Sequence, residues 1–167
     1  NPDGLLMRLP RGIRVFLACF VGALSIGFYT GLAFVGQTGG TRPAGVETQY
    51  LGNEDQEEAE IMVFKKSPRE MLTIIHTHVL SMSLIFLLLG MLVWACRLPA
   101  GLKAFLTIEP FCSLLATFGG IYLVWLGWPG WSYLVVFSGS LMTLTYTVSA
   151  AIVLYQLIFP KGRQAGI

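Results

Sequence analysis

Two histidines, His76 and His78, are the only ones in the chain, and they stand on either side of Thr77 in a long apolar stretch. Imidazole nitrogens are common ligands of haem iron and of copper. A chlorophyll-type pigment also needs only one axial histidine. In a regular helix, residues two apart point about 200° from one another, so the two rings cannot bind one metal ion together. The pair therefore predicts one ligand per cofactor from this helix, with any second ligand from a methionine, a partner subunit or a second copy.

His76 shares its expected helix face with Thr73, Ser83 and Gly90. Small side chains leave room for a flat ring or for the close approach of another helix. Counted from Ser67 at about 1.5 Å per residue, His76 lies roughly 13 Å along the helix, close to a headgroup boundary. On this argument from space, we expect His76 to be the better macrocycle ligand.

His78 shares its expected face with Met71, Ile75 and Met82. Thioether and imidazole ligands together suit copper or a haem with His–Met ligation. Methionines are also ordinary packing residues of apolar helices. His78 and Met82 are therefore candidate cofactor ligands beside His76.

Haem b is the cofactor that we expect first, and a chlorophyll-type pigment or copper on His76 or His78 is the alternative. A competing interpretation is that the histidines only form hydrogen bonds, for instance with Tyr29, Ser138 or a loop carboxylate. Quinone hydrogen bonding or a role in proton handling is a third interpretation.

The elements that must position these residues are predicted to be membrane helices. Hydrophobic residues make up 54% of the 167 residues and charged residues 12%, whereas soluble domains carry about a quarter charged residues. Four apolar runs are long enough to cross a bilayer. We expect an all-α integral membrane protein that forms one four-helix transmembrane bundle over residues 1–167, running up-down-up-down. The expected helices cover about 13–36, 68–96, 104–128 and 131–159, and loop 37–67 joins the first two.

The helix that carries the histidines has a well-defined predicted start. Ser67 is suited to accept a hydrogen bond from a free backbone N–H, Pro68 suits the first helical position, and Glu70 completes a capping box.

Basic residues predict the orientation of the bundle. If the N-terminus is cytoplasmic, seven basic residues flank the cytoplasmic ends of the helices: Arg8, Arg11, Arg14, Arg97, Lys103, Lys161 and Arg163. Four lie on the other side, namely Arg42, Lys65, Lys66 and Arg69. The excess predicts that both termini are cytoplasmic and that loop 37–67 is outside. We expect the membrane to be the bacterial inner (plasma) membrane.

Cysteines predict no disulfide, because Cys19, Cys96 and Cys112 all fall in or near the inner half of the membrane. The same positions speak against a cysteine-based zinc site or a c-type haem.

Acidic residues form two further features. The cluster over 54–60 lacks the spacing of an EF-hand loop, so we expect a solvated surface or a docking site for a basic partner.

Glu109 precedes Pro110, and we expect the spanning helix to start at this proline, with 101–108 along the inner interface. Glu109 would then lie at a helix N-terminus, where a negative charge is favourable. The alternative is a functional carboxylate inside the membrane.

Small residues in the first helix include Gly27 and Gly31, spaced as in close-packed membrane helices. We expect these glycines to pack against another helix of the same chain rather than in a dimer.

No nucleophile–base pair, phosphate-binding glycine loop or zinc-hydrolase motif occurs, so no catalytic activity of its own is expected. The pattern is similar to that of small four-helix subunits of respiratory or photosynthetic complexes. The expected function is a membrane subunit of an electron-transfer complex, with the cofactor near the outer face. The alternative is an accessory structural subunit without its own cofactor.

The expected partners are membrane lipid, other membrane subunits or further copies of the chain, and a periplasmic electron-transfer protein. The net charge of +2 indicates no nucleic acid partner.

Overall fold

Helices account for most of the chain that the computed structural model describes, residues 4–54 and 61–159. They are α1 (Leu5–Arg8), α2 (Arg11–Gln37), α3 (Pro43–Leu51), α4 (Pro68–Ala95), α5 (Ala100–Trp125), the short 3-10 helix η1 (Pro129–Trp131) and α6 (Ser132–Ile158). Helices α2, α4, α5 and the η1–α6 segment are long and apolar enough to cross a membrane, with mean hydropathies of 1.9, 2.1, 1.5 and 1.6. No strand occurs in the described ranges. The prediction of an all-α bundle with four candidate membrane-spanning helices is confirmed.

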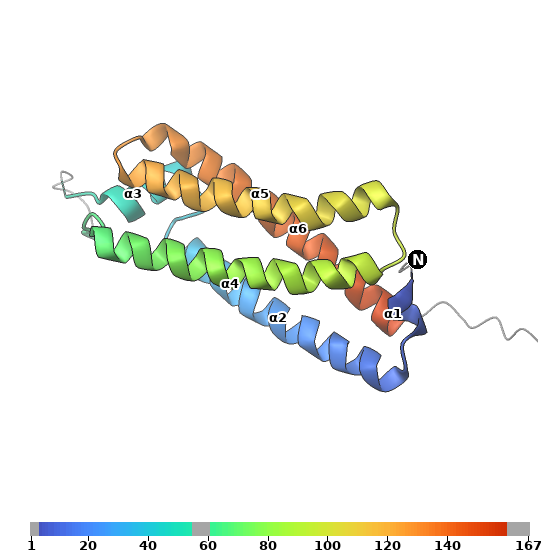
Figure 1. Ribbon diagram of the computed structural model, residues 1–167. Helices are drawn as coiled ribbons and strands as arrows, with labels where there is room; N and C mark the ends of the chain where they lie inside the picture. The colour runs from blue at the N-terminus through green and yellow to red at the C-terminus, as the bar shows by residue number, and fades with distance from the viewer. Residues whose placement is uncertain (1–3, 55–60, 160–167) are drawn as a thin grey trace, which may run out of the picture.

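The antiparallel pair α5–α6 forms the centre of the bundle, with α4 packed on α5 and α2 packed on α6 (Figure 1). The hydroxyls of Thr117 and Ser138 join the two central helices at 2.7 Å. One turn further out, a Cβ added to Gly120 would lie 2.8 Å from a methyl group of Val135. Because no side chain fits at that distance, glycine is what allows the two helices to approach so closely.

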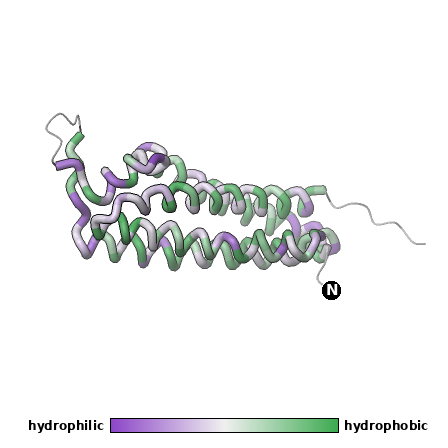
Figure 2. The backbone as a smooth tube through the Cα atoms, turned by 90° about the horizontal axis from the view of Figure 1, so that it is seen from above, coloured by the Kyte–Doolittle hydropathy of each residue, from purple (hydrophilic) through white to green (hydrophobic). Residues whose placement is uncertain are grey.

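Helix α4 packs on α5 through apolar contacts. Figure 2 shows that hydrophobic residues extend along most of the length of the long helices. The rings of Phe86 and Phe111 meet edge to face with centroids 6.2 Å apart. Nearer the end of the bundle where α4 turns into α5, called the inner end here, a Cβ on buried Gly90 would lie 3.5 Å from Thr107 of α5. These two contacts, about one turn apart, set the register of α4 against α5.

Helix α2 is the most peripheral of the long helices, and Val21 is its only buried residue. Tyr146 of α6 holds it in place. The Tyr146 hydroxyl lies 3.1 Å from the Ser25 hydroxyl, and the Phe28 ring stacks on the Tyr146 ring with centroids 3.8 Å apart.

Gly27 and Gly31 of α2 face away from the rest of the described chain. No atom lies within 4 Å of a Cβ built on Gly27 or on Gly31, apart from the helix's own nearby backbone. The expectation that these glycines pack within the chain is therefore wrong, because the contact with α6 is made by the opposite, larger side chains of α2.

The segment predicted as an irregular loop, 37–67, contains the helix α3. Pro43 begins α3, and Gly52 ends it with a φ of +87°, in the region that favours glycine. Glu47 accepts a hydrogen bond from the Ser132 hydroxyl at 2.7 Å, which ties α3 to the start of α6. Burial of α3 against the bundle also raises the pKa of Tyr50.

Of the acidic cluster at 54–60, only Glu54 lies within the described residues, and its carboxylate accepts a hydrogen bond from the Lys65 backbone N–H at 3.1 Å.

Two hydrogen-bonded contacts fix the start of α4, at the end of the bundle that carries α3, called the outer end here. The capping box is confirmed, since the Ser67 side chain accepts from the Glu70 N–H and the Glu70 carboxylate accepts from the Ser67 N–H at 2.8 Å. The indole N–H of Trp125, at the end of α5, donates to the Lys66 carbonyl at 2.7 Å.

At the other end of the bundle, the start of α2 and the end of α6 meet (Figure 1). Arg14 donates to the Leu157 carbonyl at 3.0 Å. The Gln156 side chain accepts from the Arg97 N–H at 2.8 Å and donates to the Arg97 carbonyl at 3.3 Å. The two Gln156 bonds satisfy backbone groups of Arg97 in the turn after α4, and the Arg14 bond satisfies a carbonyl group in the last turn of α6.

Glu109 does not lie at a helix N-terminus. Helix α5 begins at Ala100 and runs without a break through Pro110 to Trp125. The expectation that the helix starts at Pro110 is therefore wrong, because one proline can be accommodated inside a membrane helix whose neighbours support it. Glu109 lies in the interior of α5 instead.

The orientation predicted from the basic residues can be checked by labelling with a membrane-impermeant maleimide. In a background without the native cysteines, Thr41→Cys should be labelled in intact cells and Gly101→Cys only after permeabilisation. Thr41 is exposed, and no other atom would lie within 4 Å of a Cβ on Gly101. The opposite pattern would place loop 37–67 in the cytoplasm.

Cys96 should make stability depend on pH. Burial raises the pKa of this thiol from 9.0 to about 11, although the nearby Lys103 charge opposes the rise. The folded chain therefore holds the thiol proton more tightly than the unfolded chain. This stabilisation is complete below about pH 9 and is lost as the pH rises through about 11.

Denaturation in detergent should show the free energy of unfolding of the native protein falling by roughly 1–2 kcal/mol more than that of Cys96→Ala between these pH values. Parallel pH curves for the two proteins would contradict this assignment.

Candidate functional site

His78 has one ring nitrogen bound to the backbone and the other directed away from it. Its Nδ1 lies 2.8 Å from the carbonyl oxygen of Ile74, one turn earlier on α4. A carbonyl can only accept, so Nδ1 carries the hydrogen and donates. In the neutral ring, Nε2 then holds a lone pair that is available to a metal.

The His78 ring also packs against α5. Its centroid lies 5.2 Å from that of Phe118, with 30° between the ring planes. The backbone bond and this ring contact together restrict the rotamer of His78, although the residue itself is exposed at the edge of the α4–α5 contact.

His76 lies on the outward strip of α4. Its neighbours on that strip are strongly exposed, with 64% for Leu72, 60% for Leu80 and 51% for Leu87. The small residues expected to line a space beside His76 are separated, since Gly90 is buried against α5 while Thr73 is exposed. His76 therefore points toward lipid or toward another chain.

The methionines near His78 belong to the packing of the bundle. Met71 is completely buried, with 0% exposure, and Met82 is partly buried against the hydrophobic core. Within residues 4–54 and 61–159, no group of three or more His, Cys, Asp or Glu side chains gathers to hold a metal ion. Among the described residues, the candidate ligands on this part of α4 are thus one histidine, or one histidine with Met82.

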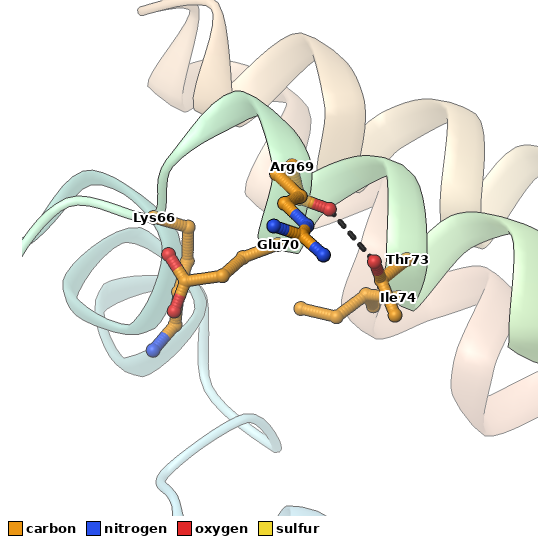
Figure 3. A pocket seen from close by; sticks show the side chains of 5 residues that line it. All are labelled: Lys66, Arg69, Glu70, Thr73 and Ile74. Carbon is orange, nitrogen blue, oxygen red and sulfur yellow. Dashed lines mark hydrogen bonds between the residues drawn. The ribbon is translucent and has the colours of Figure 1, made fainter.

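An open hollow of about 350 Å³ lies at the outer start of α4, before the histidines (Figure 3). Its lining comprises Lys66, Arg69, Glu70, Thr73 and Ile74. The Glu70 carboxylate is engaged in the capping box, and Thr73 donates to the Arg69 carbonyl at 2.8 Å. The hollow therefore offers two cationic side chains at the rim of the membrane, roughly two to three turns from His78.

Residues 40–164 match the family model Aq_1264_TM, which is described as a transmembrane helical domain. The chain belongs to this family. The protein is thus an integral membrane protein, as composition and helix lengths predict. No curated protein and no solved structure matches it.

The Aq_1264_TM match extends from just before α3 to beyond the end of α6. It contains both histidines, Phe118 and Glu109, and it leaves α1 and α2 outside. This boundary agrees with the packing, since α3 to α6 make the central contacts and α2 lies at the periphery.

Ile74 and Phe118 are the contacts of His78 that the sequence alone did not reveal. Ile74 lies four residues before His78, so the helical period could have indicated it. Phe118 could not have been found in this way, because the pairing depends on how α4 and α5 align along their lengths.

Proposed function

We propose that the protein is a membrane subunit of an electron-transfer assembly that binds haem b, or a related macrocycle, through His78. The observation that carries the proposal is the hydrogen bond from Nδ1 of His78 to the Ile74 carbonyl. Histidines that ligate metals usually donate their other ring N–H to a carbonyl or carboxylate, which sets the tautomer and the ring orientation. His78 has this arrangement, and its Nε2 would hold the metal.

His78 is a better candidate than His76 once the surroundings of both rings are compared. The argument from space favoured His76, but the small residues of its face do not line a common space. His78 instead has the oriented ring, and partly buried Met82 lies one turn further along α4.

The exposure of both histidines indicates that a second chain completes any macrocycle site. A ligated ring on this face of α4 would be covered on its far side by a partner subunit or by a second copy. Lys66 and Arg69 lie toward the aqueous end, where they would pair with carboxylate substituents of a haem. When bound, such a group supplies one-electron transfer, and this chain's residues hold and orient it.

The proposal is tested by the absorption spectrum of protein purified in mild detergent from a host that makes haem. We expect a Soret band that shifts on reduction by dithionite. His78→Ala should lose about tenfold or more of the bound haem per protein, since about 1.4 kcal/mol of ligation energy already gives that factor. His76→Ala is the matched control and should keep most of it.

If His76→Ala loses the haem and His78→Ala keeps it, His76 is the ligand instead of His78. A colourless native preparation would contradict the proposal and support the second candidate.

The second candidate is an accessory subunit without its own cofactor, and the open glycine face of α2 favours it. Gly27 and Gly31 have nothing packed on them, and small residues at this spacing let two membrane helices approach closely. A subunit that serves to join larger partners would need such a face.

Association through α2 should be sensitive to bulk at this face. Gly27→Leu and Gly31→Leu should weaken self-association or complex formation about tenfold or more, because the side chains hold the helices apart by their own size. Gly119→Leu on α5 is the matched control, since a Cβ there also has nothing within 4 Å. Energy transfer between labelled copies, or co-purification with partners, measures the effect. Equal behaviour of all three variants would exclude α2 as the contact.

A further inference from the structure

Glu109 is a carboxylate in the interior of a membrane helix without a cationic partner among the described residues. It lies roughly 14 Å from the inner end of α5 and 24 Å from the outer end, at about 1.5 Å per residue. One carboxylate oxygen, Oε1, accepts a hydrogen bond from the Ser113 hydroxyl. The other, Oε2, is buried and has no hydrogen-bond partner. A charge in this position is unfavourable unless something neutralises it.

Two further oxygens in the same stretch of the bundle lack a usual hydrogen-bond partner. Pro110 has no N–H, so the carbonyl of Leu106 lacks the donor that a regular helix would supply. On α6, the buried Ser149 hydroxyl also has no hydrogen-bond partner.

The helix register places Leu106 and Ser149 opposite one another between α5 and α6, and Glu109 lies one turn from Leu106 on α5. Thr117 and Ser138 mark where the two helices meet. Leu106 and Ser149 each lie eleven residues further toward the inner end, which is about three turns and keeps the same face. Both residues are buried, as a position between the helices requires.

The charged groups of the neighbouring elements either bond to other partners or lie at another level of the bundle. Lys103 of α5 donates to the Trp94 carbonyl at 3.1 Å, and Arg14 of α2 donates to the Leu157 carbonyl at 3.0 Å. The Tyr146 hydroxyl of α6 pairs with Ser25. On α4, the ionisable side chains are Arg69, Glu70, His76 and His78, all in its outer half, and Cys96 follows its inner end. Helix α3 with Glu47 and Tyr50 caps the outer end.

We propose that Glu109, the Leu106 carbonyl and the Ser149 hydroxyl bind a monovalent cation, a proton or Na⁺, between α5 and α6. Oxygen ligands are those that hard cations prefer, and one positive charge neutralises the carboxylate inside the membrane. The site is independent of the macrocycle proposed on α4. It gives the protein a second ligand, deeper in the helix bundle than the outer rim and nearer the inner end of α5.

The test is the reaction of purified protein in mild detergent with dicyclohexylcarbodiimide, an apolar reagent that modifies protonated carboxyl groups. The carboxyl proton passes to a carbodiimide nitrogen while the carboxylate oxygen bonds to the central carbon. The adduct then rearranges to a stable N-acylurea, and nothing is released. Mass spectrometry should locate the adduct on Glu109, and labelling should fall as the pH rises. Glu109→Gln should lose this adduct completely.

Replacing KCl by NaCl separates the two cations. Protection by Na⁺ assigns a sodium site, and labelling that depends on pH but not on Na⁺ assigns a proton site. Ser149→Ala should change the pH or Na⁺ dependence of labelling, whereas the matched control Ser140→Ala, at an exposed serine of the same helix, should not.

Absence of a Glu109 adduct in the native protein overturns the proposal. Labelling that is independent of both pH and Na⁺ also overturns it, because a carboxyl that exchanges no cation is only structural. These readouts use the native protein, so they hold even if a variant fails to fold.

Discussion

The close contact of α5 with α6 is the constraint on which the rest of the bundle depends. A membrane offers no hydrophobic effect between helices, so association relies on close packing and on polar contacts between side chains. Gly120 supplies the first, since only a hydrogen fits beside Val135, and the hydroxyls of Thr117 and Ser138 supply the second. This pair gives α4 and α2 a surface to pack on.

The sequence predicted those features of the fold that the residues of a single helix determine. Apolar length located all four long helices to within a few residues, and the Ser67–Glu70 pattern located the start of α4. Both signals are local, and a membrane makes them strong because every backbone group must be satisfied inside its own helix. The prediction failed at Pro110, where a residue that usually ends helices is supported by neighbours in the bundle.

Features that depend on which helices touch were not predictable in the same way. The glycines of α2 have the spacing of a packing face, but spacing does not tell whether the partner is in the same chain. Likewise, helical faces placed His76 among small residues, while the ring contact that distinguishes His78 comes from Phe118 on another helix. The candidate site was thus found by residue type, and the difference between its two histidines came from tertiary structure.

The hydrogen bond from Trp125 to the Lys66 carbonyl has a mechanical consequence for this site. Helices α4 and α5 are joined at the inner end by a four-residue turn, 96–99, and Trp125 joins them again at the outer end. Two helices linked at both ends cannot slide past one another, and a slip by one turn would be about 5.4 Å. The height of His78 relative to Phe118 is therefore held constant when α2, or any helix of a neighbouring chain, shifts against the bundle. Trp125 thereby helps to keep the His78 ring in register with Phe118 on α5.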